Sequence, residues 1–262
     1  MAMAAGAGAE ASQMPFIKNL ASSDRKLRTQ SLEALQSFLN SRGELPLDDA
    51  RKLWTGLYYA LWMTDRPRPQ QALAADLANL LFGLRAACAA PWLRAFWLVL
   101  SAQWPSIDAL RMDKFLLLAR RGYAAHVRWV KQRGYGADEH VPDVARVLRE
   151  VCLDVDEEAR VALGLRLHIL DICIDELENE GVLSPVEDDE PLEAVRTAFV
   201  QLFGDMVEEL RRSPVKSVRE RAKEAYADER LPWATREEGD DDDEMGESDG
   251  GADDEGWGGI DD

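Results

Sequence analysis

Apolar residues recur along most of this chain with the spacing of an α-helix. Trp54, Leu57, Tyr58, Leu61 and Trp62 fall at i, i+3, i+4, i+7 and i+8, which predicts one apolar stripe on a helix over residues 47–64. Similar stripes predict further helices over residues 14–21, 24–41, 73–84, 90–104, 108–133, 141–152, 163–177, 190–211 and 215–228. No comparable run alternates with a period of two, so the pattern predicts an all-α protein.

Residues that favour helix ends support these limits. Pro69, Pro91 and Pro142 lie near predicted first turns, where a missing backbone N–H costs least. Gly43, Gly134 and Gly181 follow predicted helices, where a left-handed residue closes the last turn.

The number and spacing of the helices indicate how they are arranged. About nine antiparallel helices, with pairs recurring roughly every 40–45 residues, are typical of HEAT or armadillo arrays. No residue-level repeat accompanies this period, so a compact irregular bundle is the alternative.

Composition divides the chain into three parts. We expect a flexible Ala- and Gly-rich N-terminus over residues 1–13, a helical repeat-like domain over 14–235, and a disordered acidic tail over 236–262. The tail holds 14 acidic residues and 1 basic residue. Its Trp257 is a candidate partner-binding residue that would lodge in a groove of another protein, and the competing interpretation is a tail that only improves solubility.

Charge is distributed unevenly along the chain. The net charge is −18, yet residues 1–133 carry 18 Lys or Arg against 10 Asp or Glu, a net of +8. Residues 134–235 carry 12 basic and 25 acidic residues, a net of −13. A basic first half and an acidic second half suit a protein placed between a polyanion and basic partners, although the asymmetry could also lack a function.

Other features limit the class of protein. Three Cys without CxxC spacing exclude a disulfide framework and fit a reducing compartment. No run approaches the roughly 18 apolar residues of a membrane span, and the Ala- and Gly-rich start lacks the basic region of a secretory signal. We therefore expect a soluble intracellular protein that does not contact a membrane.

Catalytic motifs are missing from the sequence. It contains no phosphate-binding Gly loop, no GxSxG and no HExxH, so we expect no enzymatic activity, no cofactor, no metal and no small-molecule substrate. His168, Asp171 and Asp175 share one flank of a predicted helix at i, i+3 and i+7. We interpret these three as candidate partner-binding residues rather than as an acid–base or metal site.

Basic residues give a more specific signal. The helix over residues 108–133 places its apolar side chains on one side and six basic ones on the other. These six are Arg111, Lys114, Arg120, Arg121, Arg128 and Lys131. Arg25, Lys26 and Arg28 begin an earlier helix, and Arg66 and Arg68 flank Pro67 in a turn. All of these except Arg120 are our candidate RNA-binding residues, because phosphate contact is a natural use of such a face. The alternative is a basic face that pairs with the acidic helices later in the chain.

Four separated blocks resemble one known family. The run KLWTGLYYALWMTDRP over residues 52–67, followed by Gln70 and Gln71, resembles the signature of the ribosomal RNA-processing protein 1 family, also called the Nop52 family. Three further blocks agree in order, at residues 16–21, 104–121 and 164–177. The resemblance covers about residues 14–228, and Thr55 and the short acidic tail depart from the family pattern.

The resemblance implies a specific function. Members of this family are nucleolar assembly factors of the pre-60S particle, with a HEAT- or armadillo-like fold and without catalytic activity. The implied partners are large-subunit precursor rRNA, ribosomal proteins, and assembly factors of the WD-repeat and Brix-domain types, in the nucleus and nucleolus. Two other readings stay open: a helical-repeat adaptor of another nuclear complex that binds basic proteins, and an enzyme whose site has no visible motif.

Overall fold

The structure is a computed structural model that describes residues 19–20, 22, 24–136 and 138–234. Within these residues it contains nine α-helices and no strand, which confirms the all-α prediction. The N-terminus over residues 1–13, most of the helix predicted over 14–21, the acidic tail and Trp257 lie outside the described residues.

Most helices follow the predicted segments, whereas α5 begins at Pro67, before the predicted 73–84 segment, and ends at Asn79. The helices are α3 (Arg25–Asn40), α4 (Leu47–Trp62), α5 (Pro67–Asn79), α6 (Ala86–Gln103), α7 (Ala109–Gln132), α8 (Val141–Val147), α9 (Leu163–Asn179), α10 (Glu190–Leu210) and α11 (Lys216–Tyr226). Short 3-10 turns follow α5, α6 and α7, and a π-helical turn over Leu148–Cys152 extends α8. None of the described helices combines the length and the apolar character needed to cross a bilayer.

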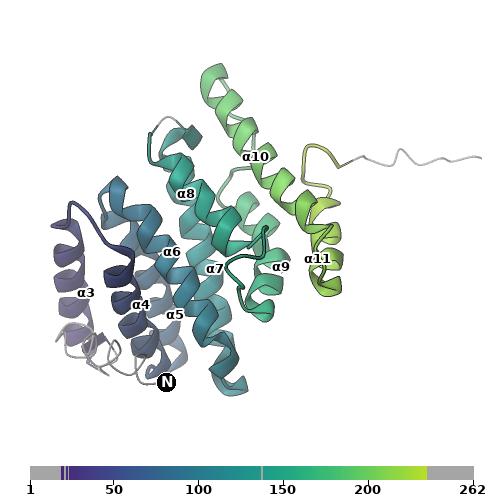
Figure 1. Ribbon diagram of the computed structural model, residues 1–262. Helices are drawn as coiled ribbons and strands as arrows, with labels where there is room; N and C mark the ends of the chain where they lie inside the picture. The colour runs from purple at the N-terminus through teal and green to yellow at the C-terminus, as the bar shows by residue number, and fades with distance from the viewer. Residues whose placement is uncertain (1–18, 21, 23, 137, 235–262) are drawn as a thin grey trace, which may run out of the picture.

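Two layers of helices form the array (Figure 1). In one layer α4 packs on α6 and α6 packs on α8, and in the other α5 packs on α7, α7 on α9 and α9 on α11. The helix α3 lies at the N-terminal end of the array, and α10 lies at the C-terminal end against α11. Successive helices alternate in direction, as expected for a HEAT- or armadillo-like array.

An aromatic core joins α4, α6 and α7. The Trp54 ring lies 4.8 Å from the ring of Trp92 and 4.7 Å from that of Phe96, between centroids. Tyr58 stacks on Phe115 at 4.6 Å. Trp54, Tyr58 and Leu61 are buried, as the stripe on residues 47–64 predicted, and Trp62 is half-buried.

Two predicted helix ends are wrong. The helix α6 begins at Ala86, so Pro91 lies inside it and not in its first turn. Alanine is the strongest helix former, and the residues Ala86, Ala87, Ala89 and Ala90 carry the helix further back than the proline suggested. Gly134 and Gly181 have φ of +63° and +64° and confirm the predicted left-handed ends, whereas Gly43 does not have a positive φ.

Candidate nucleic-acid interface

Lys114 is buried beneath the corner between α4 and α5. Its Nζ donates hydrogen bonds to the backbone oxygens of Trp62, at 2.7 Å, and Thr64, at 3.0 Å. These carbonyls close the C-terminal end of α4, where the helix dipole is negative and carbonyls lack helical partners. Burial lowers the pKa of Lys114, and Asp65 at 3.9 Å opposes this shift. Lys114 therefore does not lie on an exposed basic side of α7, as the helical spacing predicted, because the end of α4 covers it.

Further hydrogen bonds fix the same corner. The side chain of Gln70 donates to the backbone oxygen of Thr64 at 2.8 Å, and the Thr64 hydroxyl donates to that of Ala60 at 2.8 Å. Arg66 is the N-cap residue of α5, which starts at Pro67, and Arg68 follows in the first turn. The side chains of Arg66 and Arg68 are exposed and make no hydrogen bond or ion pair with another described residue. The corner thus displays two free guanidinium groups on a fixed backbone.

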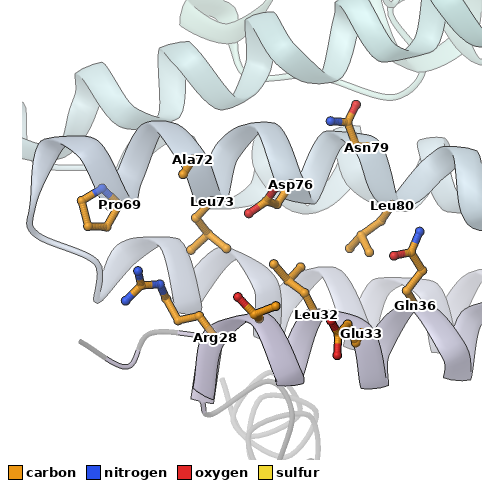
Figure 2. Close-up of a pocket in the computed structure, with 11 residues that line it drawn as sticks. Arg28, Leu32, Glu33, Gln36, Pro69, Ala72, Leu73, Asp76, Asn79 and Leu80 are labelled. Carbon is orange, nitrogen blue, oxygen red and sulfur yellow. The ribbon is translucent and has the colours of Figure 1, made fainter. Parts of the chain in front are cut away.

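The N-terminal ends of α3 and α5 lie side by side (Figure 2). Arg28 and Pro69 line one end of a groove of about 490 Å³ between the two helices. Arg28 is half-buried and donates to the backbone oxygen of Ser22 at 2.8 Å, while Lys26 is exposed. We call Lys26, Arg28, Arg66 and Arg68 the basic edge. Arg25 is the first residue of α3, and its side chain is outside the described set.

Acidic residues limit the basic edge. Glu33 and Asp76 line the groove farther from the helix starts (Figure 2). Burial raises the pKa of Asp76, while the nearby Arg28 lowers it. The positive charge is therefore confined to the end of the groove where α3 and α5 begin.

Arg111 lies in the first turn of α7 and is already engaged. Its guanidinium forms an ion pair with Asp108 at 2.5 Å and lies 4.9 Å from the ring centroid of Trp62. Asp108 also accepts a hydrogen bond from the backbone N–H of Arg111 as the N-cap of α7. Arg111 is thus partly neutralised by the carboxylate that starts its own helix.

Later basic residues of α7 bind the acidic helix α9. Arg120 contacts Glu176 at 2.6 Å and Asp175 at 3.1 Å, and Arg128 contacts both oxygens of Glu180 at 2.6 and 2.7 Å. Hydrogen bonds to these carboxylates raise the pKa of both arginines. We call this network of Arg120, Arg128, Asp175, Glu176 and Glu180 the seam. The structure thus shows the alternative noted above for these two arginines: both pair with acidic residues later in the chain.

The two remaining candidates on α7 differ from each other. Lys131 donates to the backbone oxygens of Glu180 at 2.7 Å and Gly181 at 3.2 Å, at the end of α9. Arg121 is exposed and has no hydrogen bond or ion pair with another described residue. Lys131 and Lys114 thus bind the ends of two different helices, while Arg121 stays free.

The predicted partner-binding residues of α9 are also used within the chain. The His168 ring nitrogen lies 3.0 Å from the backbone oxygen of Leu116, and burial lowers the pKa of His168. Asp171 pairs with Arg221 of α11 at 3.1 Å. Asp175 joins Arg120 to Arg230, each at 3.1 Å. Among the described residues no three His, Cys, Asp or Glu side chains are placed to hold a metal ion.

Three of the sequence blocks that carry the resemblance meet around the first half of α7. Lys114 reaches the end of the 52–67 block, and Phe115 stacks on Tyr58 within it. His168 of the 164–177 block reaches Leu116. No local pattern predicted this role of Lys114, since the covering carbonyls come from 50 and 52 residues earlier in the chain.

The fold defines an all-α helical-repeat protein. A profile of the family described as "Nucleolar protein, Nop52" matches residues 11–257. The chain belongs to the Nop52 family.

Several curated relatives are named after ribosomal RNA processing. The chain is 33% identical over 173 residues to a Ribosomal RNA processing protein 1 homolog of Drosophila melanogaster, 64% of this chain and 25% of the relative. It is 29% identical over 175 residues to homolog A of Mus musculus, 64% and 35% of the two chains. It is 27% identical over 175 residues to homolog B of Homo sapiens, 64% and 23%. The match thus spans about a quarter to a third of each relative's length.

Proposed function

We propose that this protein acts in ribosomal RNA processing, as a non-catalytic assembly factor of the large ribosomal subunit precursor in the nucleolus. Membership of the Nop52 family and relatives named for ribosomal RNA processing support this function. A two-layer helical array also suits a scaffold, because it offers long surfaces to several partners at once. On this proposal the partners are precursor rRNA, ribosomal proteins and other assembly factors, among them WD-repeat and Brix-domain proteins.

The basic edge is the part that we assign to precursor rRNA. The observation that carries this assignment is the pair Arg66 and Arg68, exposed and unpaired on a corner that Lys114 fixes from below. A guanidinium group matches the geometry of a phosphate, and the start of α5 adds the positive end of its dipole. By contrast, most of the basic residues of α7 already have partners in the chain.

Reversing the charge of the corner tests this assignment. Full-length Arg66→Glu/Arg68→Glu should bind a transcribed large-subunit precursor RNA more weakly, with a salt slope smaller by about 1.4–1.8 for two lost phosphate contacts. The matched control is Lys216→Glu/Lys223→Glu on α11, which changes net charge equally at two exposed residues. An equal loss in both variants would show that only net charge matters, and unchanged binding of the corner variant would remove the assignment.

A helical-repeat adaptor of another complex is the second candidate. The net charge of −13 over residues 134–235 favours it, since an acidic surface suits basic protein partners. Sedimentation of the tagged protein separates the two functions. The ribosomal function predicts that it co-sediments with large-subunit precursor particles and their RNA, whereas an adaptor of another complex would be recovered without them.

A further inference from the structure

The outer flank of α10 is apolar although nothing described covers it. Val195 is 36% exposed and Leu202 is 41% exposed. The exposed residues Pro191 and Ala194 precede Val195, and Ala198 lies between Val195 and Leu202, all at helical spacing. We call these five residues the end face.

The inner flank of the same helix is apolar as well. Phe199, Phe203 and Val207 are buried on it, and Gly204 lies against the Trp233 ring. A single exposed Leu is ordinary, but a helix with apolar residues on two flanks is typical of one that is buried between neighbours. Figure 1 shows α10 at the C-terminal end of the array, where no further described helix continues the packing.

Unpaired acidic residues gather at the N-terminal end of the end face. Glu187, Asp188, Asp189 and Glu190 are consecutive and exposed at the start of α10, and Asp205 is exposed near its end. Glu193 and Glu209 are neutralised by Arg196 and Arg149. Arg211 and Arg212 follow the helix, so the excess of negative charge lies at its N-terminal end.

We propose that the end face binds an amphipathic helix of another protein, with lysines or arginines beside its apolar stripe. Ala194 and Ala198 leave room for a close helix–helix approach, and Val195 and Leu202 supply apolar contact. Basic residues of the partner would meet the acids at residues 187–190. The docked helix would occupy the place that a next helix of the array would take.

Charge argues against two other occupants. The chain's own residues 236–262 carry 14 acidic residues and 1 basic residue, and their only large apolar residues are Met245, Trp257 and Ile260. A second copy of the chain would bring the same acidic rim to the interface. Both would place like charges together, which opposes association. The proposal does not depend on RNA binding, since the basic edge lies at the opposite end of the array.

Photo-cross-linking in cells tests the proposal. A photoreactive amino acid at Val195 of the full-length protein should give, after irradiation, a product with one other protein. The cross-linked peptide should be net positive and should carry apolar residues at i, i+3 or i+4, and i+7. The same amino acid at Glu220, exposed on α11, is the control position. A product with RNA, with the chain's own tail or with a second copy would overturn the proposal, as would a yield no higher than at Glu220.

A charged variant provides the second measurement. Ala198→Glu/Leu202→Glu should reduce the yield of the Val195 cross-link at least tenfold, because it places charge on the apolar stripe. Both residues are exposed, so the helical circular dichroism and the melting temperature should stay close to those of the unmodified protein. Ser217→Glu on α11, combined with Ala227→Glu at its C-cap, is the matched control. An unchanged yield would overturn the proposal, while precursor RNA binding by this variant reports separately on the basic edge.

Discussion

Arg66 and Arg68 of the basic edge and the arginines of the seam have opposite surroundings. At the edge, Arg66 and Arg68 extend into solvent without a partner among the described residues. At the seam, Arg120 and Arg128 bind the carboxylates of α9 at 2.6 Å. The helix α9 belongs to the part of the chain with a net charge of −13, and its acids neutralise the side of α7 that faces it.

This difference shows that part of the charge asymmetry of the sequence is satisfied inside the fold. The later turns of α7 use their positive charge to hold α7 against α9, so a count of basic residues overstates the surface open to RNA. Exposed and unpaired side chains are the better guide to phosphate contact, since a paired arginine must first give up its carboxylate.

The largest expected effect removes part of the aromatic core that joins α4, α6 and α7. Trp54→Ala should lower the free energy of unfolding by about 3–5 kcal/mol, because the buried ring packs on Trp92 and Phe96 and its loss leaves a cavity. Urea unfolding followed by circular dichroism measures this. Trp54→Phe is the control, and it should cost less because it keeps an aromatic ring. A stable alanine variant that had lost RNA binding would show instead that Trp54 stacks on RNA.

Acid should weaken the contact between α7 and α8. His126 is fully buried on α7, its Nε2 lies 2.9 Å from the backbone oxygen of Val144, and burial lowers the pKa of His126 to about 4. The unfolded chain takes up this proton near pH 6.5. Stability from this group is therefore complete above about pH 7 and falls by about 3 kcal/mol as the pH drops toward 4.

Unfolding free energies across this pH range check the prediction. His126→Gln keeps a hydrogen-bond donor for Val144 but does not titrate, so its stability should change less between pH 7 and 4. Equal pH dependence in the two proteins would show that other groups dominate. The pKa of Asp228 is lowered by its hydrogen bond to Arg230, so its contribution is lost only at still lower pH.

Arg128 of the seam should matter for stability and Arg68 of the basic edge should not. Arg128→Ala should cost about 1–2 kcal/mol, less than a fully buried pair, because the Arg128 side chain is 38% exposed while Glu180 is 13% exposed. Arg68→Ala should change stability by less than about 0.5 kcal/mol. Chemical denaturation of the two variants compares the regions directly. Equal costs would mean that the ion pairs at the seam add little in solution.

The sequence predicted the positions of the helices well, but it did not show which groups the basic residues contact in the fold. Helix positions depend on local spacing, so the predicted 108–133 and 190–211 segments agree with α7 and α10 to within a residue at each end. The partner of Arg128 lies 52 residues away, and no local pattern shows which acid it meets. The predicted exposure of Lys114 was wrong for the same reason, because the distant backbone carbonyl of Trp62, at the end of α4, accepts its hydrogen bond. The end face was also missed, because periodicity does not tell which apolar flank of a helix remains uncovered.

The smallest expected effect concerns Arg121, which decides how far the RNA surface extends. It follows Arg120 directly in the sequence, yet it is exposed and unpaired where Arg120 belongs to the seam. Arg121→Ala should change the free energy of unfolding by less than about 0.5 kcal/mol, because no described contact is lost. If precursor RNA passes from the basic edge along α7, the variant should reduce the salt slope of binding by about 0.7–0.9, the value of one phosphate contact. We expect this reduction, and binding measured at several salt concentrations checks it, with Arg128→Ala as the paired counterpart. A slope that Arg121→Ala leaves unchanged would confine the RNA surface to the corner that carries Arg66 and Arg68.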